Sequence, residues 1–340
     1  MQTQQSKQNQ EPIEHLFKIV SDFVMFPSLQ IAAKLDIAGL LKEGAKHVSK
    51  LAKDTGSHSD ALYRVLRILA NGGIFSEVEN RVFAQNEVSY FLREDVPLSI
   101  RKYITLEYQP EWAKTVFNLS HSVQTNQSAF RHTHNGTSLW EYFKTHPEEG
   151  QHFSQLMTEF SSVYSDVTLS EYDFAAMQTV ADVGGAHGSL LSAVLQANSH
   201  LQGVLFDSPQ VIEDAKKNIN TDIVKRCKLE SGDFLQAVPT NVDAYIMRYI
   251  LHDWSDEDCI QILKNCRIAS PKANILIVER VLQPKQNSQF TLALDLWMLL
   301  LFDNAKERTE EEYRALLEAA DYRLNRIIDT ESPFSIIEGV

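Results

Sequence analysis

The sequence predicts an α/β fold, in which a doubly wound, mostly parallel sheet is preceded by a helical domain. Three observations support this prediction. From about residue 176, short β-branched and aliphatic runs alternate with helical stretches, which is typical of parallel strands joined by crossover helices. Residues 48–84 instead combine two helical segments with two short apolar runs, the element order of a winged helix. The charge is also uneven, because residues 12–105 carry 12 Lys/Arg and 11 Asp/Glu while the whole chain has a net charge of −13.

Four segments are expected along the 340 residues. Residues 1–12 ("MQTQQSKQNQEP") are polar and Gln-rich, so we expect a disordered tail there. Residues 13–105 form the winged-helix domain, and residues 106–175 form a mostly helical connection rich in aromatic side chains. Residues 176–340 form the α/β domain, which closes with two further strand candidates, "YRLNRIID" and "PFSIIEG".

The winged-helix segment contains a helix that ends near Gly56 and a second helix for which Ser57 and Ser59 are candidate N-caps. The apolar positions of the second helix are spaced by three and four: Leu62, Val65, Leu66 and Leu69. A DNA-binding role would require a clear basic face, and this domain is nearly neutral. The preceding residues 16–41 have more apolar positions than one helical face needs, which favours a dimerisation scaffold.

Composition argues against several locations and partners. A net charge of −13 disfavours nonspecific binding to nucleic acid. The apolar stretch at 292–302 is interrupted by Asp295 and is too short to span a membrane, and the first residues do not resemble a leader peptide. The three cysteines form no C-x-x-C pair, and Cys259 and Cys266 fit the core of a helix. We therefore expect a cytoplasmic protein with neither a membrane nor a nucleic-acid partner.

The ends of the first strands suggest a nucleoside-binding site. The first strand runs into "VADVGGAHG", where Gly184, Gly185 and Gly188 permit a sharp turn and a close approach of a ligand. Acidic residues end three successive strands: Asp182, Asp207 and Asp233. The position of Asp207 suits hydrogen bonds from both hydroxyls of a ribose. Asp233 and Phe234 could receive the amino group and the ring face of an adenine.

The loop favours a cofactor without phosphates. Dinucleotide sites prefer G-x-G-x-x-G, and this loop reads G-G-A-H-G. Clustered acids suit a cationic centre, and S-adenosylmethionine combines adenosine with a sulfonium and an amino-acid tail. Its carboxylate could meet the helix N-terminus that follows Gly188.

The stretch "RYILHDWSDEDCIQIL" (248–263) places one histidine among several acids. Ser255 and Asp258 have the spacing of a capping box, and the acids at 256–258 suit the first turn of a helix. These acids require no metal, and the sequence shows no His/Cys spacing typical of a zinc site. His252 stands at the end of the fourth strand (242–251), where α/β sheets bind ligands. Its position alone leaves both a structural and a catalytic role open.

The order of "DVGGAHG", "DSPQVI", "SGDF", "RYILHDWSDED", "IVERVL" and "AKERTEEEYRALLEAADYRL" closely resembles one family. These are the S-adenosylmethionine-dependent small-molecule O-methyltransferases, including caffeic acid O-methyltransferase and bacterial enzymes that tailor polyketides. The resemblance covers nearly the whole chain and implies a Rossmann-like class I methyltransferase domain (176–340) behind a dimerisation domain (13–105). It implies that His252 is the general base, flanked by Glu279 in "IVER" and Glu307 in "KERT".

The resemblance also implies a cofactor set. Gly184 and Asp207 match contacts to the methionine part and the ribose, and Asp233 and Phe234 match adenine contacts. Asp182, Gly185 and Arg248 complete the expected cofactor-binding residues. Ala186 departs from the usual G-G-G-x-G loop, so its methyl group puts cofactor affinity in doubt, and His187 is expected to lie on the loop surface.

The acceptor site is expected on the helix around "FTLALDLWMLLLF", with a contribution from 106–175. Its candidate residues are Trp297, Met298, Phe302 and Asp253. The expected partners are a small aromatic acceptor and a second copy of the chain, bound through the N-terminal domain. S-adenosylmethionine is the expected methyl donor, S-adenosylhomocysteine the product, and no metal is expected.

Three alternatives remain at this point. The chain could bind S-adenosylmethionine yet catalyse hydroxylation or decarboxylation, it could be a winged-helix regulator that senses a ligand, or it could be a nicotinamide dehydrogenase. The sequence does not identify the acceptor, and it leaves N-methylation open beside O-methylation.

Overall fold

The computed structural model describes residues 10–107, 110–162, 170–218 and 223–340. The chain divides into two compact units between Tyr108 and Gln109, and each unit is described by itself. Residues 10–12 of the expected disordered tail belong to a helix that begins at Gln10, and residues 1–9 lie outside the described residues.

Unit 1 is helical and carries a small sheet. Its helices are α2 (Gln10–Asp22), α3 (Met25–Lys34), α4 (Ile37–Leu40), α5 (Val48–Thr55), α6 (Ser59–Asn71), η1 (Ser89–Leu92) and α7 (Arg101–Glu107). Its strands are β1 (Lys46–His47), β2 (Ser76–Glu79) and β3 (Val82–Ala84), in the order β1-β3-β2. The helix pair α5–α6 and the β2–β3 hairpin have the expected order, and β1 is an addition that residue patterns did not indicate.

The helix ends in unit 1 differ from expectation at one position. Gly56 ends α5 in the left-handed conformation, as a residue without a Cβ can do at low cost. The N-cap of α6 is His58, with no side-chain cap bond, rather than Ser57 or Ser59. This start suffices because Leu62, Leu66 and Leu69 are buried in the unit's core, and packing of an apolar face outweighs a missing cap.

The first helices expose much of their apolar surface. Phe17 and Val20 are 70% and 72% exposed within this single chain, and Leu16 and Phe23 are exposed as well. By length and composition alone, the helical stretch Pro12–Lys34 is long and apolar enough to cross a membrane. An exposed apolar face of this kind is typical of an interaction surface.

In its described residues, unit 2 begins with helices α8 to α12 and continues as an α/β domain. The helices are α8 (Pro110–Val116), α9 (Leu119–Thr125), α10 (Ala129–Thr133), α11 (Leu139–Thr145), α12 (Pro147–Ser162), α14 (Ser189–Ala197), α15 (Pro209–Asn218), η2 (Val224–Arg226), η3 (Leu251–Asp253), α16 (Asp256–Ala269), α17 (Gln289–Leu301) and α18 (Glu310–Ala319). The strands are β4 (Thr179–Val183), β5 (Gln202–Asp207), β6 (Cys227–Ser231), β7 (Ala244–Arg248), β8 (Asn274–Glu279), β9 (Val281–Leu282), β10 (Arg308–Thr309), β11 (Leu324–Asp329) and β12 (Ser335–Gly339).

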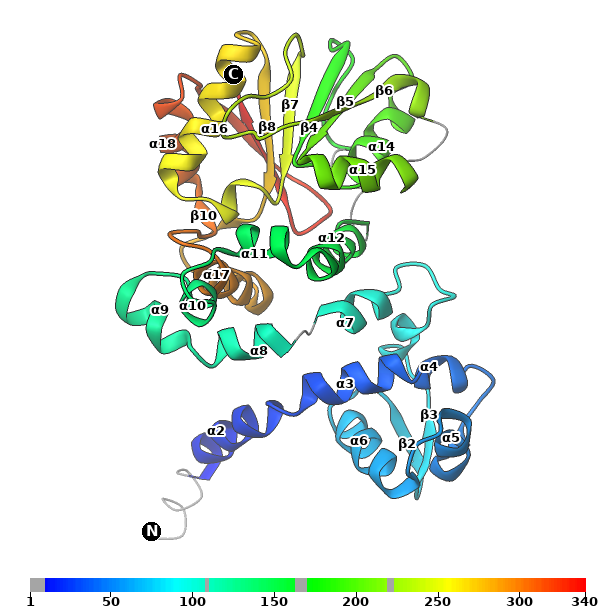
Figure 1. The fold of residues 1–340 in the computed structure, drawn as a ribbon. Helices are drawn as coiled ribbons and strands as arrows, with labels where there is room; N and C mark the ends of the chain where they lie inside the picture. The colour runs from blue at the N-terminus through cyan, green and yellow to red at the C-terminus, as the bar shows by residue number, and fades with distance from the viewer. Residues whose placement is uncertain (1–9, 108–109, 163–169, 219–222) are drawn as a thin grey trace. The chain divides into compact units, whose positions relative to one another are not determined.

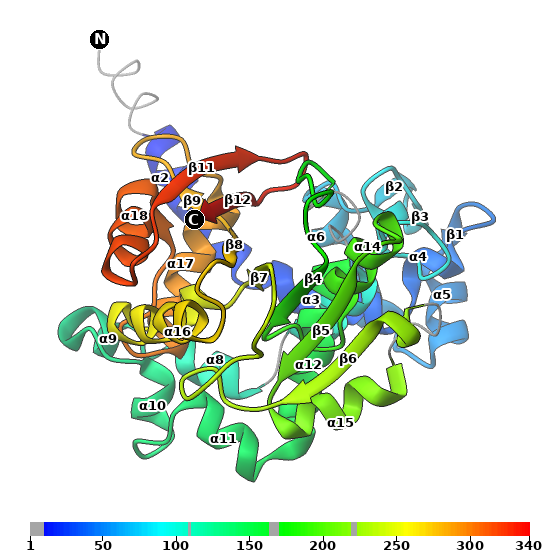
Figure 2. The same ribbon diagram turned by 90° about the horizontal axis from the view of Figure 1, so that it is seen from above.

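The central sheet has seven strands in the order β11-β12-β8-β7-β4-β5-β6 (Figure 1; Figure 2). Strands β4 to β8 run parallel, whereas β12 and β11 are antiparallel additions at one edge. The sheet order reverses direction between β4 and β7, which is where open α/β sheets bind their ligands. The prediction of a doubly wound, mostly parallel sheet is confirmed.

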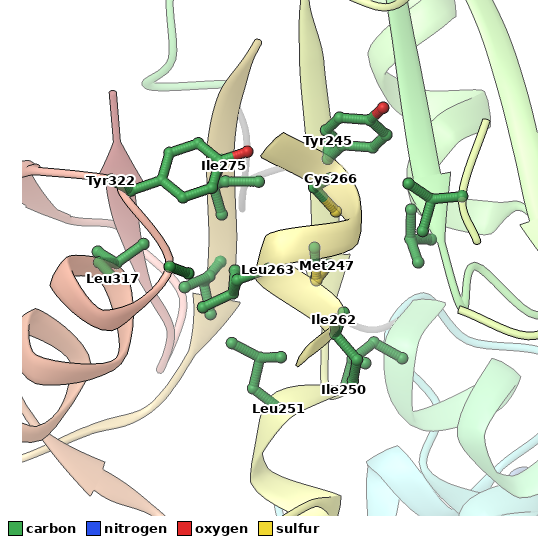
Figure 3. Close-up of a cluster of buried hydrophobic side chains, with 14 of the residues drawn as sticks. Tyr245, Met247, Ile250, Leu251, Ile262, Leu263, Cys266, Ile275, Leu317 and Tyr322 are labelled. Carbon is green, nitrogen blue, oxygen red and sulfur yellow. The ribbon is translucent and has the colours of Figure 1, made fainter. Parts of the chain in front are cut away.

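Helices cover both faces of the sheet, as a parallel sheet requires. On one face α16 and α18 pack on β7 and β8, where Met247, Leu263, Ile275 and Leu317 meet (Figure 3). Cys266 is fully buried in the same cluster, in keeping with a core role for that thiol. On the other face α14 and α15 pack against the sheet.

One strand is shorter than the residue pattern predicted. The fourth parallel strand was expected over 242–251, but β7 ends at Arg248. Tyr249 then adopts a positive φ of 55°, which breaks the extended backbone. His252 consequently lies in the short turn η3 rather than at the tip of a strand.

Candidate active site

The candidate site lies at the carboxyl ends of the parallel strands of unit 2. The loop 184–188 follows β4, and the segment 249–255 follows β7, its neighbour in the sheet. Helices α11, α12 and α17 lie beyond this edge of the sheet (Figure 1). Residues from two adjacent strand ends and from these helices can therefore meet one ligand.

The glycine loop is shaped by what its residues can adopt. Gly184 and Gly188 have φ angles of 74° and 75°, where side chains are disfavoured. A Cβ added to Gly184 would lie 2.3 Å from Ile250 Cδ1, and one added to Gly185 would lie 2.5 Å from Asp182 Oδ2. The loop 184–188, called the cradle below, thus packs too closely against Ile250 and Asp182 to allow side chains at Gly184 and Gly185.

Ala186 and His187 depart from the expected loop in different ways. Ala186 occupies the left-handed region at φ 49°, so the residue that replaces the usual glycine is strained. His187, which was expected on the loop surface, is half-buried, and its Nδ1 lies 2.9 Å from Thr158 Oγ1 on α12. The reason is that α12 packs near α14 and reaches the loop at that point. His187 therefore ties the glycine loop to the helical part of unit 2.

Two carboxylates stand beside this loop, of which Asp182 is buried and Asp207 is half-buried. Asp207, at the end of β5, accepts the N–H groups of Ala186 (3.0 Å) and Ser208 (2.7 Å), and burial raises its pKa. Burial also raises the pKa of Asp182 to about 7, although the charge of Arg248 opposes the shift. Asp182 Oδ2 is buried without a hydrogen-bond partner among the described residues.

Of the remaining expected cofactor residues, Arg248 and Phe234 lie near the same loop, whereas Asp233 is exposed. Arg248 ends β7 and is buried, and burial lowers its pKa to about 10 against the charge of Asp182. The ring of Phe234 is 3.8 Å from the Cβ position of Gly184, so it borders the cradle. Asp233 is exposed and its carboxylate accepts the N–H of Leu235, which leaves its second oxygen for a ligand.

His252 is buried and its ring is held from one side. Its Nδ1 lies 2.7 Å from Glu307 Oε1, and because a carboxylate can only accept, Nδ1 carries the hydrogen. Its Nε2 lies 3.4 Å from Asp253 Oδ1. Burial alone lowers the pKa of His252, but the charges of Asp253 and Glu307 outweigh burial and raise the pKa to about 10. Burial raises the pKa of Asp253 itself to about 7.

Glu279 holds the backbone beside the histidine rather than its ring. Glu279 Oε1 accepts the N–H groups of Ile250 (3.1 Å), Leu251 (2.7 Å) and His252 (3.3 Å). Its Oε2 accepts the hydroxyl of Tyr313 on α18 at 2.5 Å. The structure therefore separates the two acids that the resemblance paired, because only Glu307 reaches the imidazole.

Several residues that sequence reasoning missed complete this region. Arg308 is fully buried and donates to the carbonyls of Leu251 and Trp254. Asp295 on α17, seen in the sequence only as an interruption of an apolar stretch, accepts the N–H of Glu307 at 3.0 Å. A charged residue inside an apolar run was the available signal for Asp295, since a buried charge requires a partner.

The expected acceptor residues belong to one aromatic cluster. Met298 and Phe302 are buried there and Trp297 is partly buried, together with rings from α8, α10 and α11. The ring of Trp140 lies 5.3 Å from Phe302 and 6.4 Å from Trp254, in the second case nearly parallel at 12°. Trp140 Nε1 is buried with no partner among the described residues. Asp253 is the charged member of the expected set, beside His252.

No group of three or more potential metal ligands occurs within the part of the chain that the structure describes. Residues 116–323 match a family model described as the O-methyltransferase domain. Residues 17–95 match a second model, described as the O-methyltransferase dimerisation domain.

Two curated relatives extend over nearly the whole chain. The chain is 36% identical to phenazine O-methyltransferase PhzM of Lysobacter antibioticus, over 95% of each chain. It is 31% identical to 8-amino-8-demethylriboflavin N,N-dimethyltransferase of Streptomyces davaonensis, over 96% of this chain and 97% of that one.

Solved structures show the same fold. The mitomycin 7-O-methyltransferase MmcR matches with a TM-score of 0.88 and 31% identity, over 98% of each chain. The O-methyltransferase NcsB1, in complex with S-adenosylmethionine and 2-hydroxy-5-methyl naphthoic acid, matches with a TM-score of 0.78 and 28% identity, over 95% of this chain and 97% of that one.

Proposed function

The chain belongs to the O-methyltransferase family, and from that premise we propose that it methylates a phenolic hydroxyl of a small aromatic natural product with His252 as general base. The protein is an S-adenosylmethionine-dependent O-methyltransferase with the class I methyltransferase fold. The single observation that carries the finer proposal is the buried pair of His252 Nδ1 and Glu307 Oε1, 2.7 Å apart at the carboxyl edge of the sheet.

The cofactor fits the residues beside β4. Glycines at 184 and 185 let the loop backbone pack closely against Ile250 and Asp182, and Asp182 Oδ2 is buried without a hydrogen-bond partner among the described residues. Asp207 is placed for the ribose, and Phe234 borders the cradle as an adenine contact would. When bound, S-adenosylmethionine supplies a methyl group on a positively charged sulfur, which an oxygen nucleophile can attack.

The histidine provides the acid–base chemistry. The acceptor hydroxyl loses its proton to His252 Nε2, while Nδ1–H remains donated to Glu307, which fixes the tautomer and stabilises the imidazolium. A free histidine has a pKa of about 6.5 and a phenol one of about 10, a mismatch that disfavours proton transfer. Because nearby carboxylates raise the pKa of His252 to about 10, the two groups are matched.

A raised pKa has a consequence for the free enzyme. Because the carboxylates raise the pKa of His252, the protonated ring, which cannot act as a base, is favoured at neutral pH more than in a free histidine. Activity should therefore increase as the pH rises toward the pKa of His252. General-base catalysis contributes about 10²–10⁴-fold, whereas positioning two reactants contributes about 7–11 kcal/mol of the barrier. The larger share of catalysis thus depends on the rigidity of the segment that carries His252.

The aromatic cluster supports a flat acceptor. The nearly parallel rings of Trp140 and Trp254, together with Phe302, offer faces on which a planar ring can stack. The acceptor rests close to Asp253, so a neutral or cationic ring is favoured over one that carries a carboxylate there. The similarity to enzymes acting on phenazine and mitomycin skeletons agrees with this acceptor class.

The assembly is proposed to be a homodimer in the cytoplasm. The dimerisation model covers residues 17–95, and this region exposes Phe17 and Val20. A second copy would cover that face and account for the apolar helix without a membrane. In α6, Asp60 pairs with Arg81 and Arg67 lies over the Tyr63 ring, an arrangement that gives little basic surface for DNA.

An amino group is the second candidate acceptor. The relative from Streptomyces davaonensis, 31% identical, is named as an N,N-dimethyltransferase. An amine attacks through its lone pair and sheds its proton afterwards, so it depends less on a base. Loss of His252 would then reduce turnover far less than for a phenol.

The test begins with calorimetric titration of the full-length protein with S-adenosylmethionine, S-adenosylhomocysteine and NAD. We expect binding of both S-adenosyl compounds and none of NAD. Hydroxyphenazines, hydroxynaphthoquinones and aminophenols are then incubated with the enzyme and S-adenosylmethionine. Formation of S-adenosylhomocysteine together with a product heavier by one methyl group supports the proposal. A hydroxylated or decarboxylated product contradicts it.

A further inference from the structure

Arg308 makes more contacts with the His252 segment than any role given above requires. It follows Glu307 directly, and its side chain is fully buried. Its Nη1 donates to the carbonyl of Leu251 at 2.8 Å, and its Nη2 donates to the carbonyl of Trp254 at 2.9 Å. Its Nε and Nη2 both donate to Asp256 Oδ1, at 3.0 and 2.8 Å. One guanidinium thus binds three points on the stretch 251–256.

This stretch cannot hold its own shape. The turn η3 has three residues, and within the stretch 251–256 one backbone N–H, that of Trp254, donates to a carbonyl, that of Leu251, so the other buried carbonyls require donors from elsewhere. The planar guanidinium offers several N–H donors in a fixed geometry, which a lysine cannot reproduce. Arg308 therefore sets the distance between Leu251 and Trp254, the two residues that bracket His252 and Asp253.

The opposite side of the segment is held by different groups. Glu279 Oε1 accepts the N–H groups of residues 250–252, and the N–H of Lys306 donates to the carbonyl of His252 at 3.2 Å. Side chains of consecutive residues in an extended chain point in opposite directions. Glu307 can therefore reach the imidazole while its neighbour Arg308 reaches the backbone of the same segment.

The pairing of two short strands brings these residues together. β10 pairs with β9 in parallel register, with Arg308 opposite Val281, two residues after Glu279. The arginine of "KERT" and the glutamate of "IVER" thus reach the same segment, one on its carbonyl groups and one on its amide groups.

We propose that Arg308 is a positioning residue for His252, because its guanidinium fixes the backbone from which the imidazole is presented to the acceptor. This inference rests on the proposed role of His252 as the general base. Arg308 contacts neither cofactor nor acceptor in this account and acts through the segment 251–256.

The test compares Arg308→Lys with Arg226→Lys. Arg226 is a control with a similar number of partners, because its guanidinium also binds three points, the carbonyls of Leu195, Asn198 and Leu201, outside the candidate site. Both substitutions keep the positive charge but replace the planar guanidinium, with its several N–H donors, by an ammonium group. The full-length variants, loaded with S-adenosylhomocysteine, are labelled with ¹⁵N-histidine, and the His252 signals are assigned with His252→Ala.

The two variants should differ in what happens to His252. In Arg308→Lys, we expect the Nδ1 signal to move or broaden as the Glu307 bond loosens, and the His252 pKa to fall toward its ordinary value. The acidic residues that face the ring, Asp253, Glu279 and Glu307, are unchanged in this variant. With an accepted phenol, kcat should fall about tenfold to hundredfold with little change in KM, since small displacements of a reacting group are costly. Arg226→Lys should leave the His252 signals and kcat unchanged, even if its melting temperature falls.

Asp256→Asn provides a milder second variant if Arg308→Lys does not fold. This substitution weakens the bonds from Arg308 to the partly exposed side chain at position 256. It should therefore move the His252 signals in the same direction by a smaller amount. Unchanged His252 signals and an unchanged pH titration in both variants would overturn the inference. A wild-type protein that binds no S-adenosylhomocysteine would instead contradict the proposed function, and the His252 spectra would still report on Arg308.

Discussion

The loop after β4 and the segment after β7 lie at the same edge of one sheet, yet they are held in different ways. The glycine loop depends on its own backbone, with positive φ angles at Gly184, Ala186 and Gly188. The His252 segment depends on side chains that are distant in sequence, mainly Glu279, Glu307 and Arg308. One region is shaped mainly by local backbone angles, with single contacts from Asp207 and Thr158, and the other is shaped by several long-range side-chain contacts.

This difference assigns different sensitivities to the two regions. Changes in the glycine loop should act on cofactor affinity, because they alter the cradle itself. Changes around His252 should act on turnover, because they alter where a proton acceptor stands. Four substitutions test this division, beginning with the largest expected effect.

Replacing His252 with alanine should separate the two regions most clearly. We expect kcat for a phenol to fall about 10²–10⁴-fold, because the proton acceptor is lost, while affinity for S-adenosylhomocysteine stays close to wild type. Steady-state kinetics and calorimetry measure the two quantities. His200→Ala is the control, since among the described residues that ring bonds the carbonyl of Phe174 and no group of the candidate site. A loss of cofactor affinity in a folded His252→Ala protein would contradict the division.

Asp207→Ala should do the opposite. It removes a half-buried acceptor from the N–H groups of Ala186 and Ser208 and from the proposed ribose contact. We expect S-adenosylhomocysteine to bind about tenfold to hundredfold more weakly, because hydrogen bonds to a charged group contribute roughly 1.5–3 kcal/mol each. Asp243→Ala is the control, because Asp243 also accepts two N–H groups but at residues 178 and 179. Equal losses of affinity in both variants would remove Asp207 from the cofactor site.

Asp253→Asn should shift the pH dependence of catalysis. Burial lowers the pKa of His252, and the charge of Asp253 is the largest of the effects that raise it. Without that charge, His252 loses its proton at lower pH, so the rising limb of the plot of kcat/KM against pH should move to lower pH. Glu257→Gln, an exposed acid of α16, should leave the limb in place. A limb that stays or moves to higher pH in Asp253→Asn would contradict the assignment of His252 as the titrating base.

The same raised pKa predicts an effect on stability. The charged pair of His252 and its carboxylates stabilises the fold fully below pH of about 6.5, the ordinary value for histidine. That contribution should be lost as the pH rises through the folded-state pKa of about 10. His252→Ala should therefore flatten the decline of the melting temperature between these two pH values.

Ala186→Gly should have the smallest effect. Glycine relieves the left-handed strain at φ 49°, but it also loses more entropy on folding, so we expect a net gain of about 0.5–1 kcal/mol in the free energy of unfolding. Chemical denaturation measures this gain. Leu98→Gly, at φ 58° in unit 1, is the control for strain relief outside the cofactor loop. Improved S-adenosylhomocysteine affinity should occur for Ala186→Gly alone.

Local residue patterns were sufficient for much of the fold. The alternation of apolar runs and helical stretches located strands β4 to β8, and the acids ending β4 and β5 lie beside the glycine loop. These local patterns did not predict features that depend on a single backbone angle or on a contact between residues distant in sequence. β7 ends at Arg248 because Tyr249 adopts a positive φ, and local patterns did not indicate that His187 lies within hydrogen-bonding distance of Thr158.

The sequence by itself determined the sheet, the glycine-rich turn and the position of Asp207 after β5, because these depend on periodicity and on the conformational freedom of single residues. Only the tertiary structure decided what Glu279, Glu307 and Arg308 each contact. Their side chains are alike in requiring a buried partner, and the sequence does not state which partner folding supplies. Pairing of β9 with β10 directs Glu307 to the imidazole of His252 and Arg308 to its backbone, while Glu279 holds the amides.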